Sequence, residues 1–179
     1  MDKNADFACN VRLLGPEDFD LFWPVRLLAL QESPDAFGAS YEESKALTRD
    51  EAVRRLDPQD GSFVLGAFAR EKGDELIGTL GFFRNPGAKN RHRGVIWGVY
   101  VRSSARGKGI ARALMVRGLE QCRSLADLED VILTVVIGNQ AARRLYHSLG
   151  FETYGLDKRA LKIGDRYLDE ELMSLRLRG

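Results

Sequence analysis

The chain has 179 residues, of which 44% are hydrophobic and 30% are charged, so it is long enough for one globular domain with a buried core. A net charge of +1 argues against extended nucleic-acid binding, and no apolar run is long enough to cross a membrane. We expect residues 1–7 to be flexible and residues 8–179 to form a single domain. The 2 cysteines, the 2 histidines and the lack of a signal-peptide pattern predict a cytoplasmic protein without a metal site.

Apolar periodicity and turn residues predict the elements of the first half. In chain order they are a strand over 8–14, a helix from Pro16 to about Gln31 with a kink or restart at Pro24, a loop over 33–44, a capped helix from Thr48 to Leu56, and an antiparallel hairpin of strands 62–70 and 75–84 around a Lys72-Gly73-Asp74 turn.

The second half alternates between strands and helices. A basic loop over 85–93 precedes a strand over 95–101, a helix that begins near Gly107, a strand over 131–137, a helix that Asn139 caps and Gly150 ends, and closing strands over 151–155, 160–163 and 168–177. The strand–helix–strand connection predicts a parallel, right-handed pair of strands.

Positive charge is concentrated in the middle of the chain. From Leu76 to Leu119 there are nine Lys or Arg residues and no Asp or Glu, whereas the rest of the chain holds all 26 acidic residues. This distribution favours a small polyanionic ligand, and a surface patch without a function is the alternative.

The start of the helix near Gly107 carries unexpected charges, because Arg106, Lys108 and Arg112 surround it. Cations beside the positive end of a helix dipole are unfavourable unless an anion lies between them. Gly107 and Gly109 allow backbone N–H groups to approach such an anion, so the segment predicts a phosphate or pyrophosphate site. It is neither a P-loop, which needs a Ser or Thr after Gly-Lys, nor a dinucleotide fingerprint.

A second segment makes the pattern specific. Residues 135–151 contain the spacing N-x-x-A-x-x-L-Y-x-x-x-G-F, carried by Asn139, Ala142, Leu145, Tyr146, Gly150 and Phe151. With Arg106, Gly109 and Ala111 in the spacing Arg/Gln-x-x-Gly-x-Gly/Ala, the chain resembles the GNAT acetyltransferase family over most of its length. The resemblance implies an α/β (α+β) fold with a mixed, mostly antiparallel sheet of six to seven strands, a central splayed parallel pair and helices on both faces.

The resemblance also implies acetyl-CoA as co-substrate and no metal. The pyrophosphate would be held by backbone N–H groups of Arg106, Gly107, Lys108, Gly109, Ile110, Ala111 and Arg112. The pantetheine arm would pair with Val99, Tyr100 and Val101 where the parallel strands splay after Val99, and Asn139 would contact it from the other side. Either Arg143 or Arg144 could reach the adenosine phosphates, and solvated helix arginines are the equal alternative.

Acyl transfer to an amine needs a deprotonated amine, an oxyanion stabiliser and a proton for the leaving thiolate. We expect the Val99 N–H to stabilise the oxyanion and Tyr146 to donate the proton to the thiolate. The alternative is that Tyr146 is a core tyrosine without a catalytic role. The base stays unassigned because residues 93–102 contain no acid. The candidates that remain for the base are Asp35, Glu42, Glu43, His92 and a water chain. His147 is given no role.

The sequence therefore predicts an acetyl-CoA-dependent N-acetyltransferase that acts on a primary amine of a small-molecule or amino-acid-like acceptor. Transfer would occur by direct attack in a ternary complex, in a monomer or homodimer without nucleic-acid or membrane partners. A protein N-terminal or lysine acetyltransferase and a non-catalytic acyl-CoA sensor are the alternatives. The acceptor and the acyl preference beyond acetyl stay open.

Overall fold

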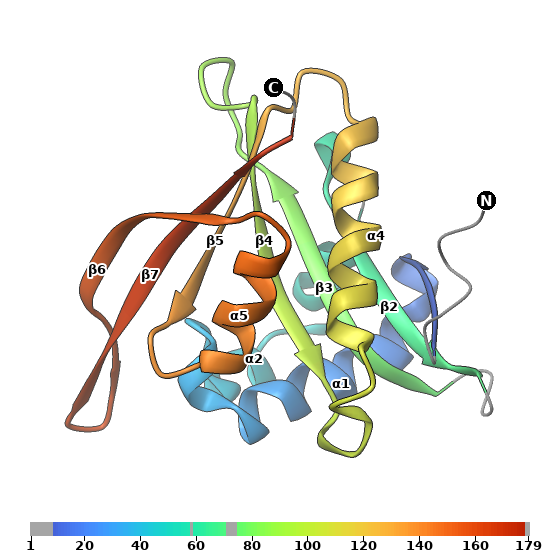
Figure 1. Cartoon of the computed structure of the whole chain (residues 1–179). Helices are drawn as coiled ribbons and strands as arrows, with labels where there is room; N and C mark the ends of the chain where they lie inside the picture. Colours follow the sequence, from blue (N-terminus) through green and yellow to red (C-terminus); the bar gives the residue numbers. More distant parts are fainter. Residues whose placement is uncertain (1–8, 58, 71–74, 178–179) are drawn as a thin grey trace.

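The computed structural model describes residues 9–57, 59–70 and 75–177, and within them one sheet of seven strands forms the centre of the molecule (Figure 1). The strands are β1 (Cys9–Leu14), β2 (Phe63–Ala69), β3 (Leu76–Arg84), β4 (Arg93–Val101), β5 (Asp130–Val136), β6 (Glu152–Ile163) and β7 (Arg166–Arg176). Their order is β1-β2-β3-β4-β5-β7-β6. Of the described pairs, β4 with β5 is parallel and the others are antiparallel, which confirms the predicted mixed sheet.

Helices cover both faces of the sheet, as predicted. The α-helices are α1 (Phe19–Glu32), α2 (Tyr41–Lys45), α3 (Arg49–Val53), α4 (Ile110–Ser124) and α5 (Gln140–Ser148). Short 3-10 turns are η1 (Pro16–Asp18), η2 (Pro34–Ala36), η3 (Arg54–Leu56), η4 (Gln59–Gly61) and η6 (Ser103–Ala105). In Figure 1, α4 and α5 lie in front of the sheet and α1 lies behind it. Each face has its own hydrophobic cluster, one with α4 and α5 and the other with α1 and α3.

Three predicted elements differ from the structure. The helix does not restart at Pro24, because α1 continues through it. Pro24 and Asp20 are on the exposed side of α1, where a carbonyl without an intrahelical partner can bind water. The segment 33–44 contains η2 and the start of α2 rather than a plain loop. The expected strands 151–155 and 160–163 are the single strand β6, whose pairing with β7 shifts twice and whose Arg159 adopts a φ of 58°.

The β2–β3 hairpin is confirmed by its antiparallel register. The turn expected at 72–74 and the flexibility expected of residues 1–7 lie outside the described residues. No helix in the described part of the chain is long and apolar enough to span a membrane. Cys9 and Cys122 are both free and buried. Within the described ranges, no group of three or more His, Cys, Asp or Glu side chains could hold a metal ion. The cytoplasmic location and the monomeric or homodimeric state stay predictions.

A β-bulge in β4 positions the site. The β3–β4 register shifts between Thr79 and Gly81, so Gly98 and Val99 together oppose one residue of β3. Gly98 has a φ of 62°, which favours glycine, and its carbonyl accepts a hydrogen bond of 3.2 Å from the buried Thr79 hydroxyl.

The parallel strands β4 and β5 pair only over Arg93–Val95 and Asp130–Ile132, and they diverge beyond. The strands were expected to splay after Val99. This position is wrong, because the pairing already ends at Val95. The bulge at Gly98 lies beyond the last paired residue of β4, and a bulge ordinarily increases the local twist of its strand.

Candidate active site

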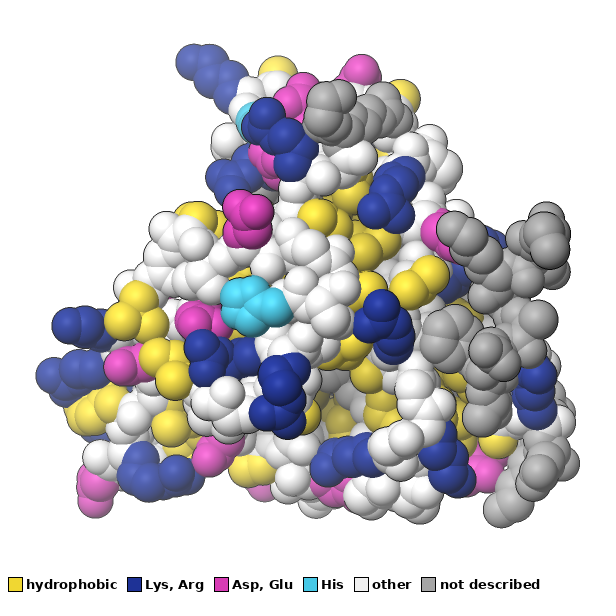
Figure 2. All heavy atoms as spheres, viewed as in Figure 1, with side chains coloured by type: hydrophobic (Ala, Val, Ile, Leu, Met, Phe, Trp, Pro, Cys, Tyr) yellow, Lys and Arg dark blue, Asp and Glu magenta, His cyan; other side chains and the backbone are white. Residues whose placement is uncertain are grey.

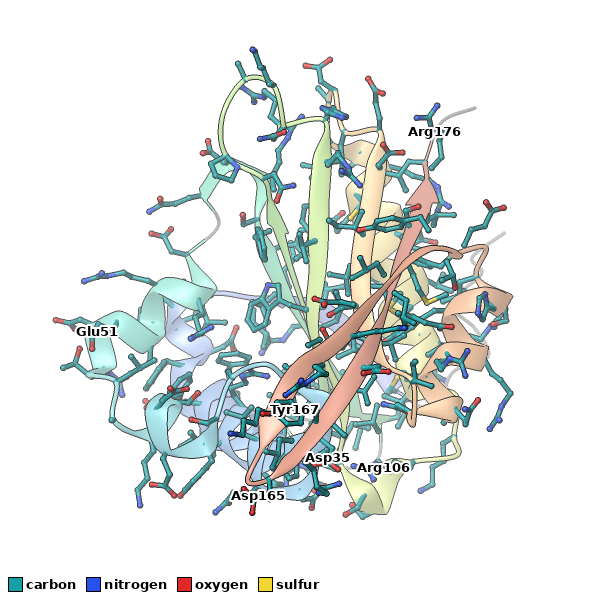
Figure 3. The ribbon with its side chains drawn as sticks, turned by 90° about the vertical axis from the view of Figure 1, so that its left-hand side faces the viewer. Asp35, Glu51, Arg106, Asp165, Tyr167 and Arg176 are labelled. Atoms are coloured by element: carbon teal, nitrogen blue, oxygen red, sulfur yellow. The ribbon has the colours of Figure 1, made fainter. Side chains whose placement is uncertain are left out.

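A cleft of about 1770 Å³ opens where β4 and β5 diverge. It reaches from α1, η2 and η3 on one face of the sheet to α5 and the start of α4 on the other. The tip of the β6–β7 hairpin forms one wall and lies beside η2 (Figure 3). An ion pair of 3.2 Å between Arg166 and Asp35 joins the hairpin to η2 at this end of the cleft.

The start of α4 offers free backbone donors at the edge of the cleft. Helix α4 has no side-chain cap and no acidic residue in its first turn. Among the described residues, no group accepts a hydrogen bond from the N–H groups of 107–112. Gly107 and Gly109 have φ values of 78° and 76°, and the space that a Cβ of Gly107 would occupy is open. Lys and Arg side chains surround this end of α4 (Figure 2), so the geometry suits an anion.

The arginines at this turn also have structural partners, which the sequence did not indicate. Arg106 donates from Nε to the Val101 carbonyl at 3.0 Å, its Nη2 lies 3.6 Å from Glu32, and its N–H donates to Ser103. Arg112 donates to the Ser148 hydroxyl on α5 at 2.9 Å. Lys108, by contrast, has no partner in the described part of the chain.

The edge of β4 that faces away from β3 is open beyond Val95 and includes the segment after the bulge. Arg102 donates its N–H to the carbonyl of Ile77 in β3. Alternation along the strand therefore directs the backbone groups of Tyr100 to β3 and those of Val99 and Val101 to the open edge. Tyr100 instead uses its side chain, which donates to Glu32 at 2.8 Å. Burial and this carboxylate raise the pKa of Tyr100 to about 12.

Tyr146 reaches the cleft from α5. Its side chain is 7% exposed, and its ring packs against Phe151 at 6.0 Å between centroids. Burial raises the pKa of Tyr146 to about 12, so the phenol keeps its proton at neutral pH. The tyrosine thus combines a core contact with access to the cleft.

Two contacts fix α5. Asn139 caps the helix, since its Oδ1 accepts from the Ala142 N–H at 3.2 Å. Arg143 donates to both carboxylate oxygens of Glu171 on β7, at 2.6 and 2.8 Å. Arg143 is therefore engaged by β7, which favours a structural role over a phosphate contact.

The expected candidates for the base are mostly placed elsewhere. Glu42, Glu43 and His92 do not line the cleft, and Asp35 is paired with Arg166. His147 has its Nδ1 3.1 Å from the Phe151 carbonyl.

Sequence reasoning missed Glu170, a cleft residue of β7 that lies opposite Val136 of β5. Burial raises the pKa of Glu170, and the charge of Asp157 adds to this effect while the hydrogen bond with Thr134 opposes it. The signal in the sequence is an acid between Leu168 and Leu172, two residues away on either side and on the same face of the strand, where an apolar residue is usual.

Sequence reasoning also missed Arg26, which lies among apolar residues of α1 and is 5% exposed. Its guanidinium lies 5.1 Å from the Phe37 ring centroid and 5.6 Å from that of Trp97. Burial, together with the charge of Arg55, lowers the pKa of Arg26 to about 10, which leaves it cationic at neutral pH. Its position on the apolar face, one turn after Phe22, is the signal that could have found it.

The fold and the cleft are those of an acetyltransferase-like α/β domain. The structure of a GNAT-family acetyltransferase from Streptococcus pneumoniae matches with a TM-score of 0.82 at 23% identity, over 94% of this chain and 98% of that one. A protein from Salmonella typhimurium, whose structure contains its cofactor acetyl-CoA, matches with a TM-score of 0.81 at 21% identity, over 96% and 95% of the two chains. The chain belongs to the acetyltransferase (GNAT) family, whose model matches residues 26–151.

The curated proteins that this chain resembles are also acetyltransferases. A mycothiol acetyltransferase from Streptomyces scabiei is 30% identical over 148 residues, which are 83% of this chain and 44% of the relative. An L-2,4-diaminobutyric acid acetyltransferase from Vibrio cholerae is 34% identical over 94 residues, which are 52% of this chain and 53% of the relative. The chain spans about half the length of these relatives. The resemblance indicated by the two motifs is confirmed.

Proposed function

We propose that the chain is an acetyl-CoA-dependent N-acetyltransferase that acetylates a primary amine of a small-molecule or amino-acid-like acceptor by direct attack in a ternary complex. The observation that carries the proposal is the cleft between the diverging strands, with free N–H groups at the start of α4 and Tyr146 along its wall. The names of the curated relatives support a small amine as acceptor.

The residues at the cleft fit acetyl-CoA, because the start of α4 offers uncapped donors and open space at Gly107. The free N–H groups of 107–112 would hold the pyrophosphate, whereas the expected contribution of the Arg106 N–H is not available because it donates to the Ser103 carbonyl. Val99 and Val101 would pair with the pantetheine arm by their backbone, and Tyr100 would line it. The Asn139 side-chain NH₂ would contact the arm from α5. When bound, acetyl-CoA supplies the activated acetyl group.

Three groups of the chain then carry out the proton transfers and stabilise the developing charge. The Val99 N–H stabilises the oxyanion that develops on the acetyl carbonyl. Glu170 accepts the proton of the acceptor's ammonium group, which ordinarily has a pKa of about 10 and is charged at neutral pH. Tyr146 Oη holds a proton for the departing thiolate, and its pKa of about 12 keeps that proton on the phenol in the resting protein.

The proposed activity is tested by measuring thiol release from acetyl-CoA with a panel of amines, free amino acids and short peptides. We expect release with small amines or amino acids. Binding of acetyl-CoA without release by any acceptor would favour the sensor alternative instead. Release with peptides alone would contradict the small acceptor and favour a protein acetyltransferase.

Replacing Glu170 by Gln tests the base. We expect kcat/KM at pH 7 to fall by about a hundredfold, the lower end of the range for general-base loss. The variant should approach the wild type at high pH, where the amine is already neutral. Because the pKa of Glu170 is raised, wild-type activity should fall as the pH drops through that raised value, and the variant should lack this limb.

Glu171→Gln is the matched control for Glu170→Gln. It changes the neighbouring carboxylate, whose pKa is lowered by Arg143 and which holds α5 to β7. A pH profile that changes equally in both variants would assign the effect to the structure of β7 and not to a base at Glu170.

A further inference from the structure

Arg26 is a buried cation without an anion beside it. Although the residue is only 5% exposed, its Nη1 has no hydrogen-bond partner among the described residues. The described part of the chain also places no carboxylate within ion-pair distance of this guanidinium. A buried charge is costly unless it is paired, so the arrangement calls for a partner that the chain itself does not provide.

The neighbours of Arg26 add to its positive potential. The aromatic faces of Phe37 and Trp97 stabilise the guanidinium but accept no hydrogen bond in its plane. Arg55 lies 5.9 Å from the same Trp97 ring, so two guanidinium groups share one indole. Like charges at one site favour an anion between them. Gly81 provides the room for this indole, because a Cβ there would collide with Trp97.

The carboxylates that line the cleft are engaged elsewhere. Asp57 accepts from the Gln59 side chain at 2.8 Å, and Asp169 accepts from the Arg159 N–H at 2.8 Å. Glu32 accepts from Tyr100 and lies beside Arg106, and Asp35 is paired with Arg166. Glu170 is hydrogen-bonded to Thr134 on the neighbouring strand β5. None of these groups neutralises Arg26, which therefore remains available to a ligand.

The guanidinium lies next to the β4 bulge. A Cβ built on Gly98 would be 3.5 Å from Arg26 Nη1, so this nitrogen is close to the backbone that leads to Val99. In the proposed function the Val99 N–H faces the reacting carbonyl. An anion held by Arg26 would therefore be only a few bonds from the attacking amine, as the carboxylate of an α-amino acid is.

We propose that Arg26, assisted by Arg55, binds the carboxylate of the acceptor, and that the acceptor is an amino acid with a free α-carboxylate. This inference rests on the proposed function and names the acceptor class of the same site. A guanidinium matches a carboxylate with two parallel hydrogen bonds, which would satisfy Nη1 and fix the direction from which the amine approaches.

The test compares amino acids with their own carboxamides as acceptors. We expect the wild type to prefer the free acid by about tenfold to a hundredfold in kcat/KM, the range of hydrogen bonds to a charged group. In Arg26→Met this preference should disappear, while activity on the carboxamide stays within about threefold. Because the preference is compared between variants, the difference in amine basicity between acid and carboxamide cancels.

Arg49→Met is the matched control. Arg49 also packs on an aromatic ring of α1, at 4.4 Å from the Phe19 centroid, but it is exposed and paired with Asp20. This variant should keep the wild-type preference. If Arg26→Met keeps it too, the proposal is overturned. An equal loss on acid and carboxamide by Arg26→Met alone would also overturn it, because Arg26 would then serve the reacting carbonyl or the fold.

Binding of N-acetyl-L-alanine and N-acetyl-L-alaninamide, followed by tryptophan fluorescence, separates this proposal from the proposed function. A parallel titration of Trp97→Phe shows which part of the fluorescence change comes from the Trp97 indole, which lies beside both Arg26 and Arg55. We expect the wild type to bind the acid at least about tenfold more tightly than the amide, and Arg26→Met to bind both alike. Equal binding of both by the wild type would refute the carboxylate site. Preferential binding of the acid without turnover of any acceptor would refute only the enzymatic activity.

Discussion

Tyr146→Phe is expected to lower kcat by about a hundredfold to ten-thousandfold, the range for loss of a general acid, while the affinity for acetyl-CoA changes by less than about threefold. The substitution removes only the hydroxyl and leaves the ring against Phe151. Because burial raises the pKa of Tyr146 to about 12, the wild-type phenol is protonated throughout the neutral range. Steady-state turnover and a direct titration with acetyl-CoA measure the two quantities separately.

Tyr154→Phe is the control for this experiment, because Tyr154 is a β6 tyrosine with 53% of its side chain exposed that does not line the cleft. It should leave both quantities unchanged. If Tyr146→Phe lowered turnover and acetyl-CoA affinity by the same factor, the hydroxyl would serve binding and not proton donation. A loss of thermal stability with unchanged turnover would make Tyr146 a core tyrosine only.

The local parts of the site were predictable because neighbouring residues determine them. The glycine-rich turn, the helix after it and the Asn139 cap each depend on a few residues whose conformations are favoured by their type. Likewise, the buried strand pair β4 and β5 with α4 between them follows from apolar runs and a right-handed connection. These elements carry the phosphate end of the proposed site.

The acceptor end was not predictable in the same way, because it depends on contacts between distant segments. Arg26 on α1 meets Trp97 on β4, and Glu170 on β7 meets Thr134 on β5, and neither pair has a local pattern that links it. The divergence at Val95 likewise depends on the register between β3 and β4, which the alternation of a single strand does not contain. The sequence indicates the acceptor end by a charged residue at a position of a helix or strand where the pattern is otherwise apolar.

Gly107→Val is expected to weaken acetyl-CoA binding by about a hundredfold, corresponding to the loss of one or two hydrogen bonds to a charged group. The site of the new side chain is open in the protein, so the effect does not arise from a clash within the chain. It arises because a branched side chain would occupy the space through which an anion approaches the N–H groups at the start of α4. Calorimetric titration with acetyl-CoA gives the change in Kd.

Gly87→Val makes the comparison quantitative, because Gly87 has a similar φ of 85° and equally open surroundings but does not line the cleft. Both variants should lose about 1 to 2 kcal/mol of unfolding free energy, since valine is strained at positive φ. Only Gly107→Val should also lose affinity for acetyl-CoA. Were both variants to bind acetyl-CoA as the wild type does, the turn before α4 would be a structural feature and the pyrophosphate would have to be held elsewhere in the cleft.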